Sequence, residues 1–256
     1  MRYTLQVQYI GKNYAGSQIQ FENGKEIETP TIQGELEKAI STLIFGKTEN
    51  NNRQIKTIFS GRTDRGVNSE GQTVHFDTDK SIVASKFIYS LNEILPDDIS
   101  VTNLKQVDSR FHAQKSAKKR YYRYVFINRK CKNAFDGDLL RIKYDINIER
   151  MQKALNYLLG EHDFSSFKSS GTLNPSKICF IEKADCQKTG DKVIIDIVGN
   201  RFLYNMVRTI VGTLLEIEGH NLQAEHMKQV LEARDRTKAG RTVSRYGLTL
   251  MNVIYN

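Results

Sequence analysis

The sequence is poor in the patterns that build disulfide frameworks, zinc ribbons and membrane helices. Its three cysteines, Cys131, Cys179 and Cys186, are an odd number without C-x-x-C spacing, which argues against a disulfide framework and a zinc ribbon. Apolar runs fall short of the about 18 residues that a membrane helix needs. The chain starts with a strand-like alternation and not with a signal-like segment, so we expect a soluble, cytoplasmic protein.

Patterns of metal and phosphate chemistry are missing as well. The five histidines form no H-E-x-x-H pattern, and no carboxylates have the spacing of an EF-hand or a two-metal site. No glycine-rich phosphate loop and no Ser-His-Asp set can be singled out. We therefore expect no metal and no cofactor, which leaves chemistry carried by one carboxylate.

Positive charge, by contrast, is plentiful. The 38 Lys and Arg residues outnumber the 29 Asp and Glu residues, which gives a formal net charge of +9. A balance this basic makes nucleic acid a reasonable first partner, although many soluble proteins are basic without binding one.

Hydrophobic periodicity predicts the order β-α-β-β-α-β for the first half. One helix opens at Pro30, and a second ends before Pro96. In the first half we predict strands at residues 3–9, 57–59, 72–77 and 99–107.

The second half repeats this order. A helix from Ile148 to Leu159 has Asn147 as N-cap and Gly160 closing it. A strongly apolar helix starts at Phe202, with Gly219 just past its end. We predict strands at 118–127, 178–187, 193–198 and 247–255, and a short helix at 224–233.

These elements predict a mixed α/β fold of two similar β-α-β-β-α-β halves, joined into a largely antiparallel sheet flanked by helices. The expected domains are residues 1–108, which carry the loop 60–68, and residues 109–256. A basic cleft between the halves is the expected site.

The loop 60–68 lies between two predicted strands and has Asp64 at its middle. Gly61 and Gly66 allow backbone angles that other residues avoid, so the chain between them can bend sharply. Arg62 and Arg65 supply positive charge that keeps the carboxylate ionised, and an ionised carboxylate can act as nucleophile or base. The alternative is ordinary turn chemistry with surface arginines.

A second candidate feature is the segment 115–124, in which five basic residues alternate with three tyrosines. This combination neutralises phosphates and stacks on bases, which makes Lys118, Lys119, Arg120 and Arg123 candidate RNA contacts. Strand alternation puts Tyr122 on the face of Arg120 and Tyr124. A solvated basic strand whose tyrosines cap the core is the alternative.

Two further arginines belong to the candidate set. Arg208 follows Tyr204 by four positions on the predicted apolar helix, so it can reach inward from a rigid support or extend to water. Arg241 belongs to a cluster of basic residues between 234 and 245, which can equally be a solvated loop.

The motif Ser-Gly-Arg-Thr-Asp-Arg-Gly-Val at 60–67, with Gly71-Gln72 and His75-Phe76, closely resembles the active-site motif of the tRNA pseudouridine synthase A family. Further stretches follow in the family's order, so the resemblance covers nearly the whole chain. These stretches are 31–37, 91–92 with 95–99, 111–113, 120–124, 162–167, 206–212 and 247–250.

The resemblance implies a cofactor-free, metal-free isomerase that converts uridine to pseudouridine in the anticodon stem-loop of tRNA, at one or more of positions 38, 39 and 40. It implies that Asp64 is the catalytic carboxylate and that Arg62 helps displace the target base. It also implies that Tyr122 packs on the flipped uracil and Arg208 pairs with Asp64. A homodimer that grips one tRNA is expected, with Arg65 and Arg241 among the RNA contacts.

The sequence departs from the family pattern at a few positions. Ser17 stands where the family usually has Trp, Arg65 where it has Ala, Asn68-Ser69 where it has His-Ala, and Gln114 where it has Arg. The rival hypotheses are a non-catalytic tRNA-binding or RNA-folding protein derived from this family and, more remotely, a metal-dependent nuclease.

Overall fold

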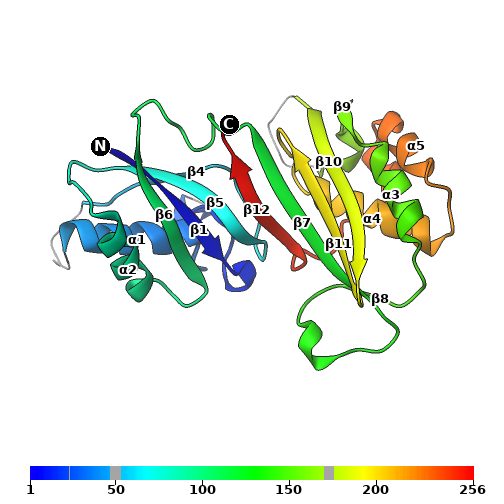
Figure 1. The fold of residues 1–256 in the computed structure, drawn as a ribbon, viewed down its shortest axis with the longest axis horizontal. Coiled ribbons are helices and arrows are strands. Elements are labelled where there is room, and N and C mark those ends of the chain that lie inside the picture. The colour runs from blue at the N-terminus through cyan, green and yellow to red at the C-terminus, as the bar shows by residue number, and fades with distance from the viewer. Residues whose placement is uncertain (23, 47–52, 170–175) are drawn as a thin grey trace. The chain divides into compact units, whose positions relative to one another are not determined.

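A computed structural model describes residues 1–22, 24–46, 53–169 and 176–256. The described chain divides into two compact units, one of residues 1–118 with 250–256 and one of residues 119–249 (Figure 1). The division into domains 1–108 and 109–256 remains a prediction.

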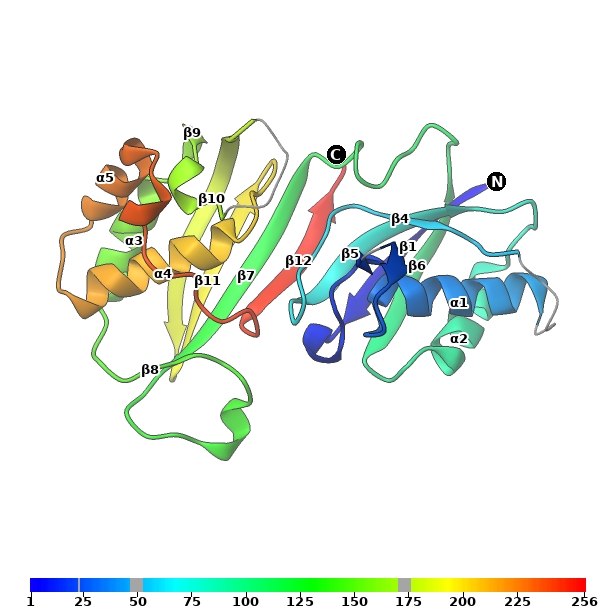
Figure 2. The same cartoon turned by 180° about the vertical axis from the view of Figure 1, so that it is seen from behind.

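The first unit packs two helices on one face of an antiparallel sheet (Figure 2). Within it, β1 pairs antiparallel with both β5 and β6, and β4 pairs antiparallel with β5. Its elements are β1 (Arg2–Tyr9), η1 (Gly11–Asn13), β2 (Phe21–Glu22), β3 (Lys25–Glu26), α1 (Ile32–Phe45), β4 (Thr57–Phe59), β5 (Asn68–Asp77), α2 (Ala84–Ile94) and β6 (Ile99–Val107). The predicted β-α-β-β-α-β order is confirmed, with the small β2-β3 hairpin added where a plain connection was expected.

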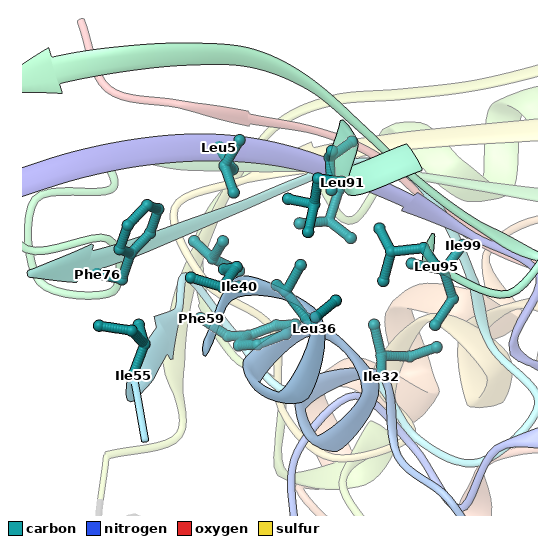
Figure 3. Close-up of a cluster of buried hydrophobic side chains, with 14 of the residues drawn as sticks. Leu5, Ile32, Leu36, Ile40, Ile55, Phe59, Phe76, Leu91, Leu95 and Ile99 are labelled. Atoms are coloured by element: carbon teal, nitrogen blue, oxygen red, sulfur yellow. The ribbon is translucent and has the colours of Figure 1, made fainter. Parts of the chain in front are cut away.

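The core of the first unit lies between this sheet and α1 (Figure 3). Thr31 caps α1 by accepting a hydrogen bond from the Gly34 backbone N–H at 3.1 Å, so the helix begins just after Thr31 and not at Pro30. The apolar side chains at helical spacing, Ile32, Leu36 and Ile40, are completely buried. This packing fixes α1 against β4 and β5, the two strands that flank the loop 60–68.

The alternation of polar and apolar residues over 72–77 predicts a half-buried strand, and the structure contradicts this prediction. Every residue from Gly71 to Phe76 is buried. Val74 and Phe76 belong to the core, while His75 on the opposite face contacts the rings of Phe111 and His112. Both faces of β5 are therefore covered, and the strand also begins four residues earlier than the pattern indicated.

The second unit packs three helices against its own antiparallel strands (Figure 2). Here β11 pairs antiparallel with both β7 and β10, β9 pairs antiparallel with β10, and β8 is parallel to β7. Its elements are β7 (Lys119–Asn128), η2 (Ala134–Asp136), β8 (Arg141–Ile142), α3 (Ile148–Asn156), β9 (Gly160–Asp163), η3 (Ser165–Phe167), β10 (Ile178–Thr189), β11 (Lys192–Gly199), α4 (Met206–Gly219), α5 (His226–Ala233), η4 (Arg236–Lys238) and the start of β12 (Leu248–Ile254).

Four helix boundaries of the second unit differ from the prediction: α4 includes Gly219, α5 begins at His226, and the start of α4 and the end of α3 also differ. The apolar helix α4 begins at Met206 and not at Phe202, because Asn205 has a left-handed φ of 61° that no helix continues through. Tyr204 therefore lies outside the helix that carries Arg208. The helix α3 has the predicted Asn147 cap but ends at Asn156, and Gly160 begins β9.

Taken together, the described elements confirm the predicted mixed α/β fold with a largely antiparallel sheet flanked by helices. No described helix has the length and apolar content to cross a membrane.

Candidate active-site loop and its surroundings

The loop 60–68 connects β4 to β5 and is bent by specific backbone bonds. The Val67 N–H donates to the Asp64 carbonyl at 3.1 Å, and the Gly66 N–H donates to the Gly11 carbonyl at 3.1 Å. Gly66 has a left-handed φ of 79°, as predicted, but Gly61 has no positive φ, so that part of the prediction is wrong. The bend thus places Asp64 at the turn.

Gln72 supports the first half of this loop from inside the protein. Its side chain is completely buried, and its Nε2 donates to the Gly61 carbonyl at 2.9 Å while its Oε1 accepts from the Ser60 hydroxyl. The Tyr9 hydroxyl lies 2.8 Å from Oγ1 of Thr63. Burial raises the pKa of Tyr9 to about 12, so the phenol stays neutral and the network carries no charge.

Ser17 holds Thr63, the residue before Asp64, by hydrogen bonds to both of its backbone groups. Its backbone N–H donates to the Thr63 carbonyl at 3.0 Å, and its Oγ accepts from the Thr63 N–H at 2.8 Å. Gly16 forms an isolated antiparallel bridge with Asp64. The backbone around Asp64 is therefore fixed by buried neutral groups, whereas its side chain is only half-buried.

The two arginines of the loop point into a more exposed environment. Arg62 and Arg65 are both exposed, and Nε of Arg62 donates to Oε1 of Gln18 on the neighbouring 14–20 segment. The first unit thus brings Arg62, Asp64 and Arg65 together within four residues of one ordered turn.

In the second unit, Arg208 is held by contacts at both ends of its guanidinium group. Nε donates to the Val243 carbonyl at 2.8 Å, and Nη1 donates to Oδ1 of Asn205 at 2.7 Å. The segment that carries Val243 packs directly on α4, since a Cβ at Gly212 would lie 1.7 Å from the Arg241 carbonyl oxygen. The side chain of Arg241 itself is exposed.

On β7 the alternation of side chains is as predicted. Tyr122 packs edge-on against Phe202, with ring centroids 5.0 Å apart, and Tyr124 is buried on the same face. On the opposite face, Arg123 forms a two-pronged ion pair with Asp196 at 2.8 and 2.9 Å and donates to the Tyr121 hydroxyl. This hydrogen-bonded pair raises the pKa of Arg123 above its usual value.

The other predicted RNA contacts differ in their surroundings. Lys119 forms an ion pair with Glu182 at 2.7 Å, and Arg120 donates to the Asn200 carbonyl at 2.8 Å. Lys118 is exposed, and its backbone N–H donates to the Ile254 carbonyl. Sequence reasoning missed Tyr9 and Ser17 as supports of the loop and Asp196 as the partner of Arg123, although Gln72 stands within the motif that was singled out.

No three His, Cys, Asp or Glu side chains lie close enough to hold a metal ion within the described ranges.

Comparison with known proteins identifies the family. Residues 154–256 match the family described as tRNA pseudouridine synthase. The tRNA pseudouridine synthase A of Bacillus licheniformis is 39% identical over 257 residues, covering 100% of both chains. The chain belongs to the tRNA pseudouridine synthase A family. The Bacillus subtilis protein of that name is 40% identical over 100% of both chains, and the Francisella philomiragia protein is 37% identical over 99% of this chain and 93% of its own.

Among solved structures, a chain in "Crystal Structure of a Cbf5-Nop10-Gar1 Complex" aligns over 96% of this chain and 57% of its own, with a TM-score of 0.39 and 10% sequence identity. Family membership does not depend on that alignment, because the curated relatives match along the full length at about 40% identity.

Proposed function

We propose that this protein isomerises uridine to pseudouridine in the anticodon stem-loop of tRNA, at one or more of positions 38, 39 and 40, with Asp64 as the catalytic carboxylate. The relatives named tRNA pseudouridine synthase A support the reaction and the RNA class. The observation that carries the assignment of Asp64 is its placement on a turn whose backbone is fixed by Gly11, Ser17 and Gln72, with its own side chain half-buried.

This placement suits a carboxylate that must meet a substrate at a fixed position. A reacting group held within a fraction of an ångström by buried neighbours loses little entropy when it reacts. The carboxylate acts as a nucleophile or as a base, and both routes use the same held position. In both routes the target uracil first has to leave its stacked position in the RNA.

The other residues receive roles in the same proposal. Arg62 helps displace the target base, Tyr122 packs on the flipped uracil, and Arg208 pairs with Asp64. The held guanidinium of Arg208 and the packed ring of Tyr122 support these roles, since both side chains are ordered by neighbours in their own unit.

RNA contact is assigned to exposed and half-buried cations. The set is Arg65, Lys118, Lys119, Arg120, Arg123 and Arg241. Arg123 is the weakest member, because its ion pair with Asp196 already occupies two of its donors. We further propose a cytoplasmic homodimer that acts without a metal ion.

The test is tritium release from C5-tritiated uridine in an unmodified tRNA transcript, with a metal chelator present. We expect release by the native chain and a loss of at least about 10³-fold in Asp64→Asn, because the substitution removes the group that forms or breaks bonds. The affinity for tRNA should persist, since phosphate contacts are untouched.

Asp79→Asn is the matched control, because Asp79 is an exposed aspartate outside the loop and the same charge is removed. Full activity of Asp64→Asn would contradict the catalytic assignment. Absence of release by the native chain from tRNAs that it binds would instead favour a non-catalytic RNA-binding protein.

A further inference from the structure

The segment 129–143, which we call the 129–143 loop, leaves the sheet of the second unit and returns beside it. Figure 1 shows it as a green projection below β8, away from α3, α4 and α5. Phe135 lies in the short helix η2 of this loop and is 98% exposed. A phenylalanine so completely in water is unusual, because its burial would be favourable.

Hydrogen bonds within η2 hold the backbone around Phe135. Asn133 accepts a hydrogen bond from the Phe135 N–H at 3.0 Å, and the Asn133 N–H donates to Oδ2 of Asp136 at 3.2 Å, which forms a capping box. These hydrogen bonds fix the backbone of Phe135 at the tip of the turn.

Arg129 ties this turn to the body of the unit. Its guanidinium donates to Asp136, to Oδ2 of Asp191 at 2.7 Å and, through Nε, to the Cys131 carbonyl at 2.9 Å. At the base, the Arg129 N–H donates to the Ile142 carbonyl at 3.0 Å. The 129–143 loop is therefore closed at its base and braced inside.

The charge around Phe135 is positive. The loop holds five cations and two aspartates, a net charge of +3, and one of these aspartates, Asp136, is occupied by Arg129. Lys130, Lys132 and Lys143 are exposed. An exposed ring flanked by cations is the combination that binds RNA by stacking on a base while lysines neutralise phosphates.

A second copy of the chain fits this surface less well. In a two-fold symmetric interface the same patch meets itself, so the exposed lysines of the two copies would face each other. RNA brings the opposite charge to the same place.

We infer that the 129–143 loop is a second RNA contact, in which Phe135 stacks on an unpaired base of the tRNA and Lys130 and Lys132 contact its phosphates. Asn128 lies six positions after Tyr122 on β7, roughly 20 Å along an extended strand, so this contact is distinct from the proposed uracil site at Tyr122. A contact at that distance would fix the orientation of the RNA. The inference rests on tRNA being the substrate.

The chain contains no tryptophan, which allows a direct test. In Phe135→Trp the single indole reports on its own surroundings, and we expect its fluorescence to be quenched by unmodified tRNA, with near-native affinity. Phe135→Leu, which stays apolar but has no ring, should raise Kd about 5- to 150-fold, the equivalent of roughly 1–3 kcal/mol of stacking. KM for tritium release should rise by the same factor.

Tyr89→Trp and Tyr89→Leu are the matched controls, because Tyr89 is 68% exposed on α2 and belongs to no proposed contact. Native affinity of Phe135→Leu, or an unquenched Phe135→Trp at saturating tRNA, overturns the inference. A loss of affinity that occurs only together with a changed sedimentation coefficient in the absence of RNA also overturns it, in favour of a second copy.

Binding and fluorescence are measured without turnover. The role of Phe135 can therefore be tested even if the protein binds tRNA without isomerising it. Conversely, if the protein isomerises uridine but the Phe135 substitutions do not change tRNA binding, the proposed function stands and only the role of Phe135 is wrong.

Discussion

The loops 60–68 and 129–143 each present one functional candidate, Asp64 or Phe135, but they are held by opposite means. The first is fastened by buried neutral groups, above all Gln72, Ser17 and the uncharged Tyr9. The second is braced by one arginine between two aspartates at the surface. Buried hydrogen bonds resist salt and water, whereas exposed ion pairs are screened. The first loop should therefore be rigid under all native conditions and the second adjustable.

The largest expected effect comes from Gln72→Leu. The substitution removes the hydrogen bonds that Gln72 makes with the Ser60 hydroxyl and the Gly61 carbonyl, and the loss of a buried hydrogen bond costs about 1–3 kcal/mol. We expect the free energy of unfolding to fall by about 2–4 kcal/mol, as measured by urea denaturation. Tritium release should fall as well, because the loop that carries Asp64 loses its support.

Gln8→Leu is the control, since Gln8 is an exposed glutamine of β1 in the same unit and should change stability by less than about 0.5 kcal/mol. If both substitutions lowered the free energy of unfolding equally, the buried hydrogen bonds of Gln72 would not be what stabilises the loop 60–68.

A middle-sized effect is expected from pH, through His75 on β5. Burial, with the nearby Arg2 and His112, lowers the pKa of His75 to about 4, while Asp77 acts in the opposite direction. The unfolded chain therefore takes up this proton near pH 6.5 and the folded chain only near pH 4, so stability falls as pH drops through that window. We expect a loss on the order of 2 kcal/mol.

His75→Asn keeps an acceptor for the Ala113 N–H, which donates to Nδ1 of His75, but does not titrate. Between pH 7 and pH 4.5, the urea midpoint of the native protein should therefore fall more steeply with decreasing pH than that of His75→Asn. Parallel slopes would mean that His75 is protonated in the folded protein as easily as in the unfolded chain.

The smallest effect concerns the ion pairs of the 129–143 loop. In Arg129→Gln, and in the native chain at 1 M salt, we expect hydrogen exchange of the amides in this loop to accelerate by no more than about fivefold. Exchange in the loop 60–68 should not respond. Arg110→Gln, which breaks the exposed pair with Asp108, is the control. A salt response of the loop 60–68 equal to that of the 129–143 loop would remove the difference between them.

Local signals predicted most of the fold. The bounds of β4 and β6 agree with the apolar patterns, and the Asn147 cap of α3 is where its side chain predicts it. The start of α4 was missed because the apolar residues on both sides of Asn205 continue the helical pattern, whereas the left-handed backbone of Asn205 ends the helix there. The burial of β5 was missed because His75 is covered by residues 36 to 37 positions further along the chain.

The candidate site was likewise only partly predictable from the sequence. The motif around Asp64 could be read from the sequence, because its residues are contiguous. Its supports could not, since Ser17 and Tyr9 lie 46 and 54 positions before Thr63 in the chain. The exposure of Phe135 could also not be predicted from the sequence, because it depends on a turn that Arg129 connects to the distant Asp191.

The catalytic role of Asp64 is tested most directly by mapping pseudouridine in an unmodified tRNA after incubation with the protein, by carbodiimide treatment and primer extension. We expect new stops at one or more of positions 38, 39 and 40 with the native chain and with Asp79→Asn, and none with Asp64→Asn at equal tRNA occupancy. Stops of native intensity with Asp64→Asn would contradict that role.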